Sequence, residues 1–341
     1  MPATLSDVAN LAGVSVKTVS NVVSGYAHVS TWTRARVESA LAELDYRPNL
    51  SARNLRRGRS GVIALAVPDL GEYFAEIAFL AGRAVEEEGF TLLIDQTEGL
   101  IERENRVVEG IREQLIDGLI FSPLAIGGKE IAKRRDTTPL VLLGERISGG
   151  LLDHIAIDNV AAAREAVSHL INIGRRRIAV IGAHGTICGE AARLRLAGYR
   201  DALVEGGIPY VRRLVVPTPP GRRAHGLLAA RQLLAQKQPP DAIFALNDHL
   251  AIGALRALHE AGARVPDDVA VVGFDDIEEG RFSTPTLTTV SPDKEAIARS
   301  AVTHLVARVR GAERLPPRDT VIPHRFIVRE STVSQAAGRS S

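Results

Sequence analysis

The stretch "TLSDVANLAGVSVKTVSNVVSG" (residues 4–25) holds two short apolar clusters on either side of a Gly-Val-Ser break. Thr4 is placed to cap a first helix whose third residue, Asp7, completes a capping box. Gly13 is a turn residue that tolerates a positive φ, and Ser15 is a good N-cap for a second helix. The stretch therefore predicts two short helices joined by a tight turn.

The apolar spacing indicates how these helices pack. Two helices that cross steeply need a small residue at the contact, here Ala9, and an aliphatic residue where the second helix packs back, here Val19. This is the helix-turn-helix arrangement. A third helix is expected from Thr33 to about Leu44. The residues expected inside are Leu5, Val8, Ala9 and Ala12, then Val19, Val22 and Val23, then Val37, Ala40, Leu41 and Leu44.

The outward side of the second helix carries groups that a core does not need. Lys17 can donate to guanine, Asn21 can pair with adenine, and Val16 can contact a thymine methyl. Thr18, Ser20 and Ser24 can hydrogen-bond phosphates, which positions the helix without reading sequence. A solvated polar face is the alternative interpretation.

The charge is uneven along the chain. Residues 1–60 carry eight Lys and Arg against four Asp and Glu, whereas the remaining residues carry 34 against 36. In "YRPNLSARNLRRGRSG" (46–61), Pro48 and Asn49 start a short, very basic helix that is expected to end near Gly58. Such a helix is unstable alone. It could fold on DNA with Leu55 inserted at a minor-groove step, or it could be a flexible basic linker.

From residue 61 onward, short apolar runs alternate with amphipathic stretches of helical length, such as 74–89, 159–174 and 194–206. Repeated strand–helix units imply parallel sheets covered on both faces, and this many strands fit two sheets better than one. The order changes near the end, with a helix over about 293–310 and two short strands near Val321 and 326–328. The runs read as strands are "VIALAVP", "FTLLID", "GLIFSP", "LVLLG", "HIAID", "RIAVIG", "RLVVP", "AIFALND" and "VAVVGFDD".

The head motif, the basic segment and this body resemble the LacI family of bacterial transcription regulators over about residues 3–331. The resemblance implies a dimer whose two heads read two DNA half-sites, with paired hinge helices that each insert Leu55. It also implies a periplasmic-binding-protein-like core of two doubly wound parallel-sheet lobes.

The expected domains are an all-α helix-turn-helix head (1–46), a hinge (47–60), a core (61–331) and a polar tail (332–341). One lobe would hold about 61–158 and 291–319, and the other about 159–290 and 320–331. The predicted DNA contacts are Ser6, Ser15, Val16, Lys17, Thr18, Ser20, Asn21, Ser24, His28, Thr33, Asn49, Ala52, Arg53, Leu55 and Arg56.

Ligands of open parallel sheets bind beyond the carboxyl ends of the strands, where this chain has carboxylates, amides and aromatic rings. Such groups suit the hydroxyls and the apolar face of a sugar. Asp69 follows the first strand. The resemblance adds Arg195 in "ARLRLAGYRDAL", Asp275 in "VVGFDD" and Asn247 in "ALND". The full predicted effector set is Asp69, Tyr73, Phe74, Asp158, Arg195, Asn247 and Asp275. Gly144 and Pro292 depart from the pattern of well-known relatives, and Asp158, Asp248 and Asp276 could instead be helix N-caps.

Several other classes are disfavoured. The sequence lacks a P-loop, a nucleophile elbow and a dinucleotide-binding glycine motif, so a sugar-processing enzyme is a remote alternative. With the single cysteine Cys188 and no recognised metal spacing, we expect no disulfide, no metal and no cofactor. There is no secretory signal and no membrane span, which favours a cytoplasmic protein over a solute receptor.

The sequence therefore predicts a DNA-binding regulator, favoured as a repressor, that binds a palindromic operator as a homodimer. A small-molecule effector between the lobes would control it. A sugar is favoured and a nucleobase or other metabolite is the alternative; repression and activation are not separated.

Overall fold

The computed structural model describes residues 3–23, 26, 28–46, 59–110, 115–144, 150, 152–183, 189–219, 222–311 and 316–333. The chain forms two compact units, one ending at Gly61 and the other beginning at Val62. We call the first unit the head and the second the core. None of the described helices is both long enough and apolar enough to span a membrane.

The head contains α1 (Leu5–Ala12), α2 (Val16–Val23) and α3 (Thr31–Glu43). The expected capping box is present: Asp7 N donates to Thr4 Oγ1 at 3.3 Å and Thr4 N donates to the Asp7 carboxylate at 2.8 Å. Gly13 ends α1 with φ 60°, so the turn uses a conformation that favours glycine. Val8, Val19 and Val37, one from each helix, are fully buried and form the centre of the head.

The third helix begins two residues earlier than expected. Thr33 N donates to Ser30 Oγ at 3.2 Å, which makes Ser30 the N-cap and Thr31 the first helical residue. Thr33 therefore lies within the first turn. Val37 and Ala40 are buried as expected, and Leu41 and Leu44 are partly buried against the same core.

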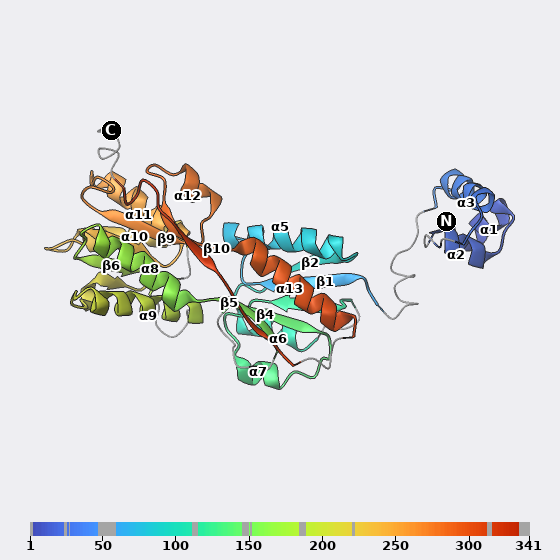
Figure 1. Cartoon of the computed structure of the whole chain (residues 1–341), viewed down its shortest axis with the longest axis horizontal. Helices are drawn as coiled ribbons and strands as arrows, with labels where there is room; N and C mark the ends of the chain where they lie inside the picture. Colours follow the sequence, from blue (N-terminus) through green and yellow to red (C-terminus); the bar gives the residue numbers. More distant parts are fainter. Residues whose placement is uncertain are drawn as a thin grey trace. The chain divides into compact units, whose positions relative to one another are not determined.

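Two six-stranded sheets form the core. The N-lobe sheet has the order β11-β5-β4-β3-β1-β2, and all its pairs are parallel. Its four inner strands β5, β4, β3 and β1 are almost entirely buried, consistent with helices on both faces, whereas the edge strands β2 and β11 are largely exposed. Figure 1 shows α5 and α13 side by side on this lobe. The strands are β1 (Val62–Val67), β2 (Thr91–Gln96), β3 (Gly118–Phe121), β4 (Leu140–Leu143), β5 (Asp153–Ile157) and β11 (Asp319–Ile322), and the helices are α5 (Glu72–Glu87), α6 (Ile101–Val108), α7 (Gly128–Ala132) and α13 (Lys294–Val309).

The C-lobe sheet has the order β12-β10-β9-β8-β6-β7 and is parallel except for the antiparallel pair of β10 and β12. It repeats the strand order of the N-lobe sheet with the second half of the chain. Its strands are β6 (Ile178–Ile181), β7 (Val215–Val216), β8 (Ala242–Ala245), β9 (Ala270–Phe274), β10 (Thr288–Pro292) and β12 (His324–Ile327). Its helices are α8 (Asn159–Asn172), α9 (Glu190–Glu205), the 3-10 turn η1 (Arg212–Leu214), α10 (Arg223–Leu234), α11 (Asp248–Glu260) and α12 (Glu278–Phe282).

The chain passes between the lobes three times: after β5, after β10, and between β11 and β12 (Figure 1). The second and third crossings lie a few residues beyond the expected boundaries at 290/291 and 319/320. Ser291 and Pro292 pair with β12 and so belong to the C-lobe, whereas residues 320–322 pair with β5 and belong to the N-lobe. The sequence shows only that these residues are extended, so their pairing partners decide to which lobe they belong.

Candidate functional site

The second helix of the head presents its predicted DNA-reading side to solvent. Val16 is 43% exposed although it is apolar, and Lys17 beside it is also exposed. Val19 and Val22 hold the opposite side in the core of the head. The start of α2 is therefore exposed to solvent on one side and packed against the core of the head on the other.

Other predicted DNA contacts take more than one role. Thr18 N donates to Ser15 Oγ at 3.1 Å, and the two hydroxyl oxygens lie 2.9 Å apart, so these residues cap α2. Ser6 and His28 are exposed, and the His28 ring lies 5.5 Å from that of Tyr26. Ser20, Asn21 and Thr33 are partly buried. Ser24, Asn49, Ala52, Arg53, Leu55 and Arg56 lie outside the described residues.

A cavity of about 250 Å³ in the core is lined by residues of both lobes. Tyr73 and Phe74, at the start of α5, contribute its aromatic wall, with ring centroids 5.1 Å apart and an angle of 79° between the rings. Apolar side chains such as Leu124 and Ile157 complete much of the surface. The cavity thus combines apolar walls with the few polar groups described next.

The side chain of Arg195, on α9, lies in this cavity in a fixed position. Its Nε donates to Asn159 Oδ1 at 2.6 Å, and its Nη1 donates to the carbonyl oxygen of Leu246 at 2.6 Å. The guanidinium carbon lies 3.5 Å from the centroid of the Phe274 ring, and Nη2 lies 3.6 Å from Asp275 Oδ1. A planar donor group and a carboxylate are therefore presented together to a ligand.

Two adjacent aspartates at the end of β9 have different roles. Asp275 lines the cavity and has a positive φ of 110°, a strained conformation for a residue with a side chain. Asp276 accepts from Arg329 Nη2 at 2.6 Å and from Ser291 Oγ at 3.0 Å. Burial favours the neutral acid, but the hydrogen bond and charge of Arg329 outweigh burial and lower the pKa of Asp276. Asp276 thus anchors the turn that aims Asp275.

The start of α11 provides the remaining polar wall. Asn247 lines the cavity, and its side-chain oxygen caps α11 by accepting from Leu250 N at 2.9 Å. Asp248 is fully buried behind it and accepts from Thr289 Oγ1 at 2.6 Å and from Ile277 N at 2.9 Å. Burial, and then the charge of Asp275, raise the pKa of Asp248 well above its ordinary value.

The prediction of Asp69 and Asp158 as cavity residues is not supported, because neither side chain lines the cavity. Asp158 N-caps α8 by accepting from Ala161 N at 2.9 Å, and Asp69 accepts from Gly71 N at 2.7 Å in the turn before α5. Both are exposed. Backbone N–H groups at helix starts thus engage these carboxylates, which was the alternative role for Asp158.

Some cavity residues were missed by sequence reasoning. Ser122 and Pro123 directly follow β3, and Thr218 and Pro219 follow β7, so the strand-end rule applied to these two strands would have found them. Glu190, at the start of α9, also lines the cavity, and no strand-end signal points to it.

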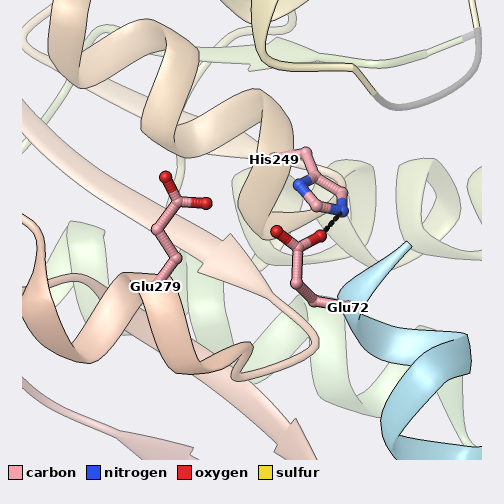
Figure 2. Close-up of side chains that lie close together, drawn as sticks. All are labelled: Glu72, His249 and Glu279. Carbon is pink, nitrogen blue, oxygen red and sulfur yellow. Dashed lines mark ion pairs between the residues drawn. The ribbon is translucent and has the colours of Figure 1, made fainter.

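Three potential metal ligands, Glu72, His249 and Glu279, come within 4.8 Å of one another although they lie far apart in the sequence (Figure 2). Arg223 donates to both carboxylates. The cluster therefore already contains a fixed cation, and no sequence spacing predicted it.

Comparison with known proteins agrees with the two-unit architecture. Residues 4–49 match the bacterial regulatory proteins of the lacI family, and residues 167–332 match the periplasmic binding protein-like domain. Over 310 residues the chain is 35% identical to the ribose operon repressor of Escherichia coli (strain K12), which covers 90% of this chain and 93% of that protein. The chain belongs to the LacI family.

Solved structures of LacI-family regulators have the same fold. The lac repressor dimer bound to operator and the anti-inducer ONPF is 29% identical, with a TM-score of 0.86 over 98% of this chain and all of that one. A complex of the transcriptional regulator CelR with cellobiose is 33% identical, with a TM-score of 0.70 over 96% of this chain and 99% of that one. The protein is therefore a LacI-family transcriptional repressor with a helix-turn-helix DNA-binding domain, and its relatives are regulators rather than enzymes.

Proposed function

We propose that this LacI-family repressor binds a palindromic operator as a homodimer. A small molecule, a sugar, binds in the cavity and changes the affinity of the protein for the operator. The observation that carries the proposal is the cavity itself. It is lined from both lobes and presents the positioned pair of Arg195 and Asp275. A ligand there contacts both lobes at once, so it can favour one arrangement of the lobes over another.

The head supplies the sequence-reading surface. Lys17 and Val16 lie at the exposed start of α2, where a recognition helix places its side chains in the major groove. Lys17 would donate to guanine, Asn21 would pair with adenine, and Val16 would contact a thymine methyl. Contacts to the DNA backbone would position the head, and we assign them to Ser6, Ser15, Thr18, Ser20, His28 and Thr33.

Exposed apolar side chains on the core support dimerisation. Phe79 on α5 is 65% exposed, and Ile94 on the edge strand β2 is 46% exposed. Phe282 on α12 is 78% exposed. Phe79 and Ile94 lie on the contacting elements α5 and β2, and large apolar groups exposed together mark an interaction surface. The solved lac repressor dimer supports a second copy of this chain as the partner.

A sugar fits the chemistry of the cavity. Arg195, Asp275 and Asn247 offer donors and acceptors for hydroxyls, and the rings of Tyr73 and Phe74 can cover an apolar sugar face. The cellobiose complex of CelR supports this class of ligand. The same aromatic pair could stack on a nucleobase, which is the second candidate.

Selection of duplex DNA from a random pool by the purified full chain, at a stated salt concentration, tests the proposal. We expect enrichment of a palindrome, and we expect Lys17→Ala to relax preference at one symmetry-related pair of positions. Anisotropy with the selected duplex then screens a sugar panel that includes ribose and cellobiose, with nucleobases as the second panel. Enrichment of no palindrome, with or without cell extract as a source of corepressor, would overturn the proposed operator binding.

A further inference from the structure

Four ionisable side chains from both lobes meet at the start of α5. Glu72 belongs to the N-lobe, whereas Arg223, His249 and Glu279 belong to α10, α11 and α12 of the C-lobe. The guanidinium of Arg223 donates to Glu72 and to Glu279, with Nε 2.8 Å from Glu279 Oε2. His249 Nε2 lies 3.0 Å from Glu72 Oε2, and the dashed line in Figure 2 marks this pair. Glu72 is thus held by two side chains of the opposite lobe.

The cluster adjoins the cavity. Glu72 directly precedes Tyr73, and His249 lies two residues after Asn247; Tyr73 and Asn247 both line the cavity. Any movement that draws the N-lobe start of α5 away from α10 and α11 must break the contacts of Glu72. The same movement would open the cavity between its two walls.

Another inter-lobe contact lies one turn along α5. Lys294, only 5% exposed, donates to Glu76 and to the carbonyl oxygen of Asp276 at 3.0 Å. Lys294 follows the second crossing of the chain, so covalent continuity already keeps it near Asp276. Arg223 and His249 lie away from the crossings in sequence, and their contact with Glu72 therefore depends on the arrangement of the lobes.

We propose that Glu72, Arg223, His249 and Glu279 form an ionic latch that holds the two lobes together beside the effector cavity. The latch rests on the two-lobe core and goes beyond the proposed function, because it names the contact that an effector-driven rotation must make or break. Glu72 is the residue on which it depends, since it alone of the four comes from the N-lobe.

The electrostatics of the cluster favour this role over that of a cation site. Glu279, and then Glu72, raise the pKa of Arg223 by accepting its hydrogen bonds. Burial opposes ionisation of Glu72, but hydrogen bonds and the neighbouring charges of His249 and Arg223 keep its pKa below the ordinary value. The side chains of Glu72, Arg223 and Glu279 are 41–43% exposed, so solvent screens the latch and its strength is modest. A modest latch suits a contact that must open.

The distance between the lobes tests the latch directly. The full chain would carry nitroxide labels at Lys129→Cys on α7 and Lys237→Cys after α10, in a Cys188→Ser background. Dilution with unlabelled chain restricts pulsed dipolar spectroscopy to distances within one chain. We expect Glu72→Gln to raise the ratio of long to short inter-lobe distances roughly threefold, the scale of a screened ion pair. Arg223→Gln should raise this ratio by a similar factor. The ratio for the double variant should be little higher than that for either single variant, because both substitutions break the same contact.

Glu87→Gln is the matched control. Glu87 lies on the same helix and pairs with Arg299 of α13 at 3.0 Å, within the N-lobe. Loss of this pair should leave the inter-lobe distances unchanged. In 1 M NaCl, the distance distribution of the wild type should shift toward that of Glu72→Gln, because salt screens the ion pairs. If Glu72→Gln and Arg223→Gln both retain the wild-type distribution, the latch does not exist. If ZnCl2 narrows the wild-type distribution but not that of Glu72→Gln, the cluster is a cation site instead. Neither DNA nor effector is needed, so failure here would leave the proposed function standing.

Discussion

Arg195, which the proposed function assigns to the effector, is held in place by its neighbours in the cavity. Asn159, Leu246 and the Phe274 ring hold its guanidinium, and Asp275 faces it at 3.6 Å. Because Arg195 already has these partners, binding loses little side-chain entropy. The neighbouring Asp276, fixed by Arg329, gives the turn its rigidity.

Asp153 is a buried charge of the N-lobe. Its side chain is fully buried at the start of β5 and accepts from Arg308 Nε at 2.9 Å and Nη2 at 3.0 Å. It also accepts from the backbone N–H of Arg318 at 2.9 Å. Burial would raise the pKa of Asp153, but the hydrogen bonds of Arg308 and Arg318 outweigh burial and lower it. The carboxylate thus joins β5, α13 and the segment leading to β11.

We predict that Asp153→Asn lowers the free energy of unfolding at pH 7 by about 3 kcal/mol, because Arg308 loses its buried counter-ion. The pKa of Asp153 is lower in the folded state, so its contribution is present above the ordinary value of 3.8 and is lost as pH falls below it. The difference between variant and wild type should therefore stay constant from pH 5 to pH 8 and shrink below about pH 4. Urea unfolding across this range measures it.

Asp268→Asn is the control, since Asp268 pairs with Arg264 on the surface. It should change the unfolding midpoint little at neutral pH. An equal loss in both variants would show that burial of Asp153 is not what makes its pair important.

At the scale of elements, close packing of helices depends on glycine in the C-lobe. A methyl group on Gly253 of α11 would lie 1.9 Å from the carbonyl oxygen of Arg223, and one on Gly226 of α10 would lie 2.1 Å from that of Leu250. The backbones of α10 and α11 therefore touch through these two residues. This contact also sets the position of Arg223, at the first turn of α10.

We predict that Gly253→Ala destabilises the core by about 1–3 kcal/mol, because α10 and α11 must move apart. Gly82→Ala on α5 is the matched control, since its methyl group would find its nearest neighbour, Leu92, at an ordinary 3.7 Å. This substitution should be neutral or stabilise by up to about 1 kcal/mol through helix propensity. Thermal unfolding of both variants measures the difference, and an equal effect would contradict the packing argument.

At the scale of the whole molecule, the proposed function links DNA binding by the head to ligand binding in the cavity of the core. Coupling between the two sites must be reciprocal: an effector that weakens DNA binding is itself bound more weakly by the DNA complex. In the proposed latch, a movement of the lobes that serves this coupling would make or break the contact of Glu72 with Arg223.

We predict that Arg195→Ala abolishes the response to effector but leaves the affinity of the effector-free protein for operator unchanged. Arg195 contacts cavity residues of the core, whereas the side chains proposed to read DNA lie in the head. Anisotropy of a labelled operator duplex, titrated with protein at several effector concentrations, separates the two effects. Loss of DNA binding without effector would mean that Arg195 is needed for the fold of the core.

Dimerisation is also tested at this scale. Ile94→Lys should dissociate the dimer and weaken operator binding at least tenfold, because it places a charge on the exposed edge strand β2. Val204→Lys, at a 79% exposed position on α9, is the matched control and should change neither property. Sedimentation equilibrium gives the mass, and an Ile94→Lys variant that remains a dimer would place the interface elsewhere.

Features set by short sequence patterns were predictable from the sequence alone. The capping box at Thr4, the turn at Gly13 and the alternation of apolar strands with helices depend on residues within a few positions of each other. Local propensity and periodicity decide such features. The strand-end rule and the family resemblance likewise led to Tyr73, Phe74, Arg195, Asn247 and Asp275, all of which line the cavity.

Tertiary structure decided what depends on long-range contacts. Pairing with β12 set the second crossing and pairing with β5 set the third, and backbone donors engaged Asp69 and Asp158. Glu72 contacts Arg223 only because the two lobes that carry these residues face each other across the cavity. Sequence patterns specify which side chains an element offers, but the partner of a charged side chain is chosen by the packing of elements that are distant in the chain.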